Sequence, residues 1–178
     1  MISSSRVDAD PSIGDVRSRR LAARLRRSAR DVAEPQRSRI SELLPRTLFI
    51  SHSSADDAFI KGPEDKGDLR PGLPLPGSIW WICCEVFSDP FYHSRKTGAA
   101  ERYVRTVGLA LLASTHVLVV WSENALRSDF VRAEIILAVE SNKKVAVCAI
   151  PGAPNFPISG VKVIHDHKAL RALLESWQ

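Results

Sequence analysis

Short, continuous apolar runs separated by segments of helical periodicity place the strongest constraint on the fold. These runs are strand-sized and lack the polar alternation of a half-exposed strand, which indicates strands buried on both faces. Helical patterns occupy 99–113, 128–141 and 167–177. Because parallel pairing requires such crossovers, we predict an α/β fold with a five-stranded parallel sheet and helices on both faces. The predicted strands span 47–51, 82–87, 116–121, 144–150 and 161–165.

Two segments of the body fall outside this alternation. A short helix is predicted from Ser54 to Ile60, with acids in its first turn, where the helix dipole favours them. Residues 62–77 contain four prolines and four glycines, so no regular helix runs through them. Trp80 and Trp81 follow this insert and are predicted to pack in the core.

The positive charge is concentrated at the N-terminus. The chain of 178 residues has a formal net charge of +5. Residues 1–46 hold eleven arginines, no lysine and six acids, which alone gives +5. The rest of the chain therefore has a net charge of zero. We therefore predict two parts: an Arg-rich, partly helical arm (1–45) and a globular domain (46–178). Because a nucleic-acid-binding face is expected on a folded domain, charge on an arm argues against nucleic acid as a partner.

Within the arm, residues 16–32 show a narrow amphipathic stripe. Leu21, Leu25, Ala29 and Val32 lie on one side, arginines fill the others, and Pro35 ends the pattern. We favour a helix that packs Leu21 and Leu25 on the domain, or that acts as a docking or assembly element. Contact with an acidic partner is the third possibility.

Composition excludes several classes of protein. No apolar run approaches the ~18 residues of a membrane span, and the N-terminus lacks the apolar segment of a signal peptide. The three cysteines, Cys83, Cys84 and Cys148, lie in apolar runs, which favours reduced, buried thiols in a cytoplasmic protein. We expect no membrane partner.

Familiar cofactor and catalytic signatures are missing. The chain has neither a dinucleotide-binding GxGxxG nor a phosphate-binding GxxxxGK[ST]. The pair His165 and His167 lacks a further ligand, so we expect no metal site. Ser51, His52 and Asp56 could be arranged as a hydrolase triad, but the GxSxG context of the nucleophile is absent.

Three polar clusters follow predicted strands at the edge where parallel sheets bind ligands. FISHSSADDAFI (49–60) follows the first strand, VFSDPFYHSRKTG (86–98) the second, and VVWSENALRSDFVRAEI (119–135) the third. In this order and spacing they resemble the Toll/interleukin-1 receptor (TIR) domain family: its box 1, its second strand with the BB loop, and its S-x-[WF]-[CV]-x-x-E helix segment. The resemblance covers about 47–177 and implies a flavodoxin-like sheet. Phe130 and Val131 replace the commoner Trp and Cys, and the 62–77 insert replaces most of a regular first helix.

The resemblance implies an activity, because many TIR domains cleave NAD⁺ at the nicotinamide–ribose bond through a glutamate that corresponds to Glu134. Glycosidases need two carboxylates since an alcohol must be protonated to leave. Nicotinamide leaves as a neutral molecule, so one carboxylate that stabilises the oxocarbenium-like transition state suffices. Helical spacing puts Glu134 on the flank of the apolar stripe formed by Val131, Ile135, Ala138 and Val139. The plain alternative is a surface glutamate paired with Arg127 or Arg132.

The remaining candidate residues would bind the substrate. Aromatic side chains of the 89–98 loop could stack on adenine or nicotinamide, its cations Arg95 and Lys96 could meet the pyrophosphate, and Trp121 could equally be core. NAD⁺ is the substrate, and no cofactor is expected. The candidates are Ser51, His52, Asp56, Asp89, Phe91, Tyr92, Arg95, Trp121, Ser122 and Ser128.

We therefore expect a TIR-domain NAD⁺ glycohydrolase or cyclase that yields nicotinamide and ADP-ribose or a cyclic relative. The expected setting is intracellular immunity, as a defence against phage. The expected partners are other copies of the chain, as a homo-oligomer or TIR–TIR assembly, and a sensor or effector protein in trans. The alternative is a non-enzymatic scaffold that assembles through the loop at 89–98. A nucleotide-signal sensor using the same cleft is a third hypothesis.

Overall fold

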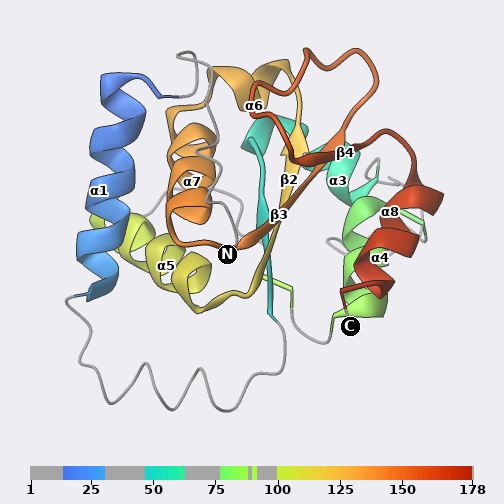
Figure 1. The fold of residues 1–178 in the computed structure, drawn as a ribbon, viewed down its shortest axis with the longest axis horizontal. Helices are drawn as coiled ribbons and strands as arrows, with labels where there is room; N and C mark the ends of the chain where they lie inside the picture. Colours follow the sequence, from blue (N-terminus) through green and yellow to red (C-terminus); the bar gives the residue numbers. More distant parts are fainter. Residues whose placement is uncertain (1–13, 31–46, 63–76, 88–89, 92–99, 178) are drawn as a thin grey trace, which may run out of the picture.

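A computed structural model describes residues 14–30, 47–62, 77–87, 90–91 and 100–177 (Figure 1). Most of the predicted 62–77 insert and most of the 89–98 loop lie outside the described residues. The described part is an α/β fold with a parallel sheet.

The sheet has four strands in the order β1-β2-β3-β4. All pairs are parallel, and Ile50 lies opposite Leu118, which in turn lies opposite Ala146. β1 and β2 are buried along their whole length, as their continuous apolar runs predict. The strands are β1 (Leu48–Ser51), β2 (His116–Trp121), β3 (Lys144–Ala149) and β4 (Lys162–Ile164).

The prediction of a strand at 82–87 is wrong, because this run belongs to helix α4 (Ile79–Val86). Its buried residues, Ile79, Ile82 and Cys83, follow helical i, i+3, i+4 spacing. Ser78 caps the helix by accepting a hydrogen bond from the backbone N–H of Trp81. A nearly continuous apolar run hides this spacing, since a buried strand and a buried helix look alike over so few residues.

Among the residues that the structure describes, Phe91 is the one that meets the sheet edge next to β1. Its N–H donates to the Leu48 carbonyl at 2.8 Å, and the Ile50 N–H donates to the Phe91 carbonyl at 3.0 Å. Phe91 thereby forms an isolated parallel bridge with Phe49. The described residues therefore contain four strands and one bridge in place of the five predicted strands.

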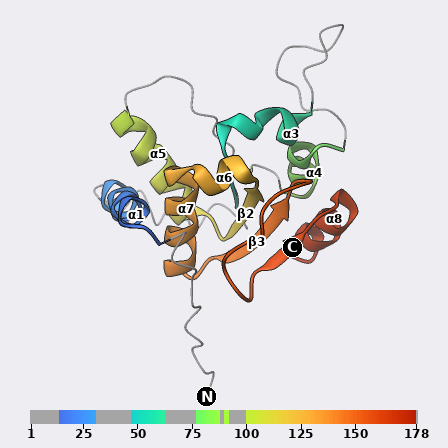
Figure 2. The same cartoon turned by 90° about the horizontal axis from the view of Figure 1, so that it is seen from above.

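Helices cover both faces of the sheet (Figures 1 and 2). Alternate residues of β2 belong to two separate cores: Val117, Val119 and Trp121 to one, Leu118 and Val120 to the other. The second core is shared with α3 (Asp57–Lys61), α4 and α8 (His167–Glu175), and the first with α5 (Ala100–Ala113) and α7 (Asp129–Glu140). Between β2 and α7 lies the short helix α6 (Glu123–Arg127).

Helix α1 (Val16–Arg30) packs on the outer side of α5 and α7 (Figures 1 and 2). Leu25 is fully buried, and Leu21 is half-buried but packs against the same core, so the predicted packing of both residues on the domain is confirmed. Ala29 is fully buried as well. Ser18 and Ala22 are also buried. The buried face is thus made mostly of small side chains, which let helices approach closely.

The closest approach occurs at Gly108 of α5. A Cβ added there would lie 2.4 Å from the backbone carbonyl oxygen of Leu25 in α1. A backbone atom cannot rotate away as a side chain can, so the contact needs glycine. The α1–α5 packing therefore depends on the absence of one methyl group.

Gly108→Ala should consequently destabilise the protein. In an unhindered helix the same change stabilises by about 1 kcal/mol, but here we expect the sign to reverse, with a loss of roughly 1–3 kcal/mol from overpacking. Chemical denaturation measures this free energy of unfolding. Arg105→Ala, at an exposed position of the same helix, is the control and should change it little. A stabilised Gly108→Ala protein would mean that α1 does not dock as described.

Three other sequence expectations concern the cysteines, the two tryptophans after the insert, and membrane spans. Cys83 and Cys148 are buried, whereas Cys84 is exposed on α4, contrary to the prediction that all three are buried. No disulfide joins them. Trp80 packs against the core, but Trp81 is 36% exposed. Among the described helices, none has the length and apolarity to cross a membrane.

Candidate functional site

The candidate residues lie around the carboxyl ends of β1 and β2. Ser51 is the last residue of β1, and Ser122 follows β2 directly. Because these strands are parallel neighbours, the two ends meet at one edge of the sheet. Ser128 caps α7 by accepting a hydrogen bond from the Val131 N–H at 3.3 Å, so its hydroxyl starts the helix that carries Glu134.

Glu134 is the buried acid of this edge. Its side chain projects from α7 toward β1, and the Ser51 hydroxyl donates a 2.6 Å hydrogen bond to Oε2. The residue is 5% exposed. Burial raises the pKa of Glu134 to about 8, and the Ser51 hydrogen bond opposes that rise. Near neutral pH the carboxyl group is therefore mostly protonated in the isolated chain.

The sequence predicts that Glu134 lies on the flank of an apolar stripe, and the structure shows that this prediction is wrong. Its helical neighbours Ala133 and Leu137 are also buried, whereas Val139 is 36% exposed. At about 100° per residue, this places Glu134 at the centre of the buried face. Ala133 and Leu137 share a core with Ala22 and Leu25 of α1, so the packing of α1 widens the buried face of α7.

The alternative of a surface glutamate paired with Arg127 or Arg132 does not hold. Arg127 pairs with Glu123 at 2.8 Å. Arg132 pairs with Asp129 and Asp15, and its Nε donates to the Ser18 hydroxyl at 3.0 Å. Both arginines thus have other partners, and Glu134 faces inward.

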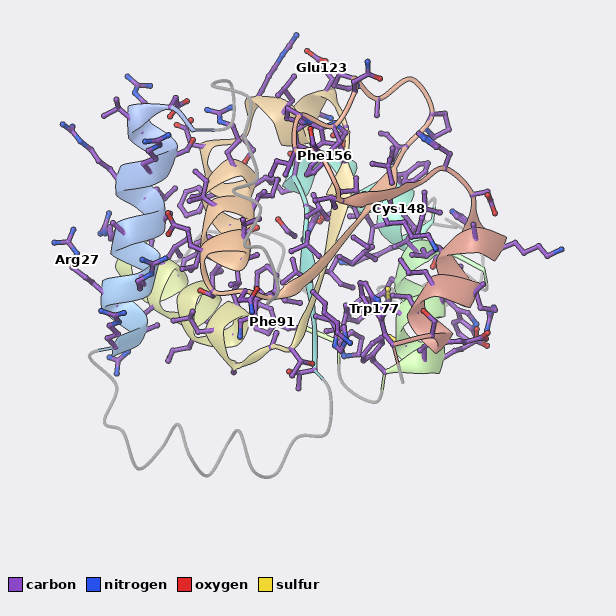
Figure 3. All side chains as sticks on the ribbon, viewed as in Figure 1. Arg27, Phe91, Glu123, Cys148, Phe156 and Trp177 are labelled. Carbon is purple, nitrogen blue, oxygen red and sulfur yellow. The ribbon has the colours of Figure 1, made fainter. Side chains whose placement is uncertain are left out.

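A small pocket borders Glu134. The space between its lining residues is about 210 Å³ when the open solvent beside them is included, so the enclosed part is smaller still. The Phe49 and Phe91 rings stack inside it, with centroids 5.4 Å apart and planes 13° from parallel. Figure 3 labels Phe91 among the side chains. The pocket is lined by Phe49, Ile50, His52, Phe91, Tyr103, Val107 and Glu134.

His52 is held at the pocket by its neighbours. Its Nε2 lies 3.2 Å from Asp57 Oδ1, and only 3% of its side chain is exposed. Burial lowers the pKa of His52, and the nearby Asp57 carboxylate partly opposes this. His52 is therefore mostly neutral near pH 7.

Asp56 belongs to a separate polar cluster beside the pocket. Its Oδ2 accepts a 2.6 Å hydrogen bond from the Ser122 hydroxyl, and its Oδ1 accepts one of 2.8 Å from Asn124 Nδ2. The Ser122 oxygen also accepts from the Ala125 N–H at 2.9 Å, which caps α6. These bonds tie the 3₁₀ turn Ser54–Asp56 to α6 and satisfy the buried carboxylate within the protein.

Trp121 is core rather than pocket. It is fully buried, its Nε1 donates to the Pro154 carbonyl at 2.9 Å, and its ring meets Phe156 edge-on. This geometry leaves no face of the indole for a ligand.

The structure thus brings together four of the predicted residues, and separates others from them. Ser51 and the pocket residues His52, Phe91 and Glu134 form one group; Asp56 and Ser122 form the adjoining cluster. Asp89, Tyr92 and Arg95 lie outside the described residues. The sequence analysis missed five residues, although Tyr103 and Val107 lie four positions apart on one face of the helix predicted at 99–113: Phe49, Ile50, Tyr103, Val107 and Asn124.

The described residues contain no group of three or more His, Cys, Asp or Glu side chains able to hold a metal ion. Comparison with protein-family models, curated proteins and solved structures gave no match. The likeness to the TIR family therefore rests on the three sequence motifs.

Proposed function

We propose that the chain is a TIR-type NAD⁺ glycohydrolase or cyclase, with Glu134 as its catalytic carboxylate. The observation that supports this is the burial of Glu134 at the carboxyl edge of a parallel sheet, bonded to Ser51 and on the wall of a pocket. A buried acid without a neighbouring positive charge costs stability, and such groups concentrate at functional sites.

The chemistry requires the ionised form of this acid. As the bond between ribose and nicotinamide breaks, positive charge develops on the sugar, and a carboxylate beside it stabilises that charge most strongly where water is excluded. The pyridinium ring of NAD⁺ is itself cationic, so its arrival favours the ionised form of Glu134. Ser51 would act as a positioning residue, since its hydroxyl holds Oε2 at 2.6 Å.

The pocket bears on how the enzyme would work. Its volume of about 210 Å³ is small for a dinucleotide, so most of the substrate must lie beyond these seven residues. Such a site suits an enzyme that is completed on assembly, and we propose that the chain acts as a TIR–TIR oligomer with a sensor or effector in trans, in intracellular (antiphage) immunity.

The test is incubation of the purified protein with NAD⁺, at concentrations that promote assembly as well as at dilution. Released nicotinamide and the mass of the second product identify hydrolysis or cyclisation. An assembled protein that leaves NAD⁺ intact would favour the non-enzymatic scaffold, for which the Ser51–Glu134 bond is a structural contact.

Activity should rise with pH through the pKa of Glu134. Because burial raises that pKa to about 8, the catalytic ionised form is scarce below it and predominates above it. We expect kcat/KM to be roughly tenfold lower at pH 7 than on the alkaline plateau. Rates measured from pH 6 to pH 9.5 check this, and a flat or falling profile would contradict an essential ionised Glu134.

A further inference from the structure

The outer face of α1 is the most strongly charged surface of the described residues. The helix carries seven arginines among its fifteen residues and no acid. Arg26 pairs with Glu140 of α7. The other six are exposed and form no ion pair with any described residue: Arg17, Arg19, Arg20, Arg24, Arg27 and Arg30.

These six arginines share one side of the helix. The buried residues of α1, from Ser18 to Ala29, centre on one direction, and at about 100° per residue Arg20, Arg24 and Arg27 project from the opposite side. Figure 3 shows Arg27 pointing away from the body. The face from Arg17 to Arg30 is about 20 Å long at 1.5 Å per residue. We call it the arginine face.

The arginine face is part of the folded body, not of a free tail. Leu25 and Ala29 are fully buried, and Arg132 of α7 bonds both Asp15 and Ser18 at the start of the helix. The sequence argued against nucleic acid on the ground that a basic face should lie on a folded domain. With α1 packed on α5 and α7, that condition is met.

The chemistry of the face favours phosphate. A guanidinium forms paired hydrogen bonds with phosphate oxygens and stays charged at every physiological pH. Over 20 Å, duplex DNA presents a phosphate charge about every 1.7 Å of its axis, so a rigid row of arginines meets several phosphates at once.

Two other occupants fit less well. Helices that lie on membranes insert an apolar face, but the apolar side of α1 is buried against α5 and α7, and its exposed large apolar residue is Val16 at the very start. Single-stranded nucleic acid is held by aromatic stacking, and α1 has no aromatic residue. We propose that the arginine face binds the phosphate backbone of double-stranded nucleic acid, without sequence preference.

The test uses the full chain and a labelled 30-base-pair DNA duplex of arbitrary sequence, with binding followed by fluorescence anisotropy. We expect binding at 50 mM salt that weakens by about 10³-fold at 200 mM, as for six phosphate contacts. The triple variant Arg20→Gln, Arg24→Gln, Arg27→Gln should bind at least tenfold more weakly at 50 mM salt and lower the salt slope by about 3. Glutamine keeps the helix, and the buried face is untouched.

The matched control removes the same charge elsewhere. Arg127→Gln, Lys162→Gln, Lys168→Gln changes three exposed cations outside α1 and should retain most of the affinity and slope. Equal weakening in both triple variants would overturn the proposal, as would no binding of the unchanged protein at 50 mM salt. Tighter binding to phosphatidylserine vesicles than to the duplex would assign the face to lipid instead. Glu134→Gln should bind DNA normally, so this result is independent of NAD⁺ cleavage.

Discussion

Glu134→Gln is expected to abolish the release of nicotinamide from NAD⁺. The amide has nearly the same size and still accepts the Ser51 hydrogen bond, but it carries no negative charge for the developing oxocarbenium ion. Loss of one preorganised electrostatic group costs about 10²–10³ in rate. The measurement is nicotinamide release by assembled protein. The control, Glu123→Gln, changes an exposed glutamate of α6 and should keep full activity.

The same variant has a stability signature that shows it is folded. The folded-state pKa of Glu134, about 8, lies above its ordinary value of 4.5. Between these values the unfolded chain is ionised while the folded chain holds the proton, so stability falls as pH rises from 4.5 to 8. Glu134→Gln should remove this part of the pH dependence and be the more stable protein at pH 8. Activity that survives the substitution would show that the site is assigned wrongly.

Trp121→Ala should cause the largest loss of stability of any single change considered. The indole is fully buried, packs edge-on against Phe156 and donates to the Pro154 carbonyl. Its removal leaves a large cavity and an unpaired carbonyl, at a cost of roughly 3–5 kcal/mol. Against the roughly 5–15 kcal/mol typical of a domain, this is a large share of the total stability. Denaturant unfolding gives the value.

Trp81→Ala is the matched control, since it removes the same side chain from a position that is 36% exposed. It should cost clearly less. A small effect of Trp121→Ala, combined with weaker NAD⁺ binding, would instead return Trp121 to the list of ligand-contacting residues.

The sequence predicts best those strands that have a hydrophobic core on both faces of the sheet. β2 is apolar throughout because both of its faces meet a core, and its bounds, His116–Trp121, match the sequence prediction. The same pattern failed at 82–87, since an apolar run of a few residues fits a buried strand or a helix equally well. Which of the two forms depended on the Ser78 cap and on packing against α8.

The sequence predicted the part of the candidate site that lies at the strand ends, but not the residues that other elements bring to it. A change from apolar to polar residues predicts where a strand ends, and this signal indicated Ser51, His52 and Ser122. Tertiary contacts decided that Asp56 is committed to Ser122 and Asn124, and that Tyr103 and Val107 complete the pocket. Those two residues come from α5, more than fifty positions after Ser51 in the sequence, and a local pattern does not encode such neighbours.

By itself, the sequence determined the α/β class, all four described strands to within a residue at each end, and Glu134 as the acid to test, because burial period and motif spacing are local properties. Only the tertiary structure decided the environment of that acid. The packing of α1 over α7 widens the buried face, and burial then raises the pKa of Glu134 to about 8. The same packing turned an Arg-rich segment into a fixed, charged surface, since it is the burial of Leu25 and Ala29 that fixes the direction of the arginines.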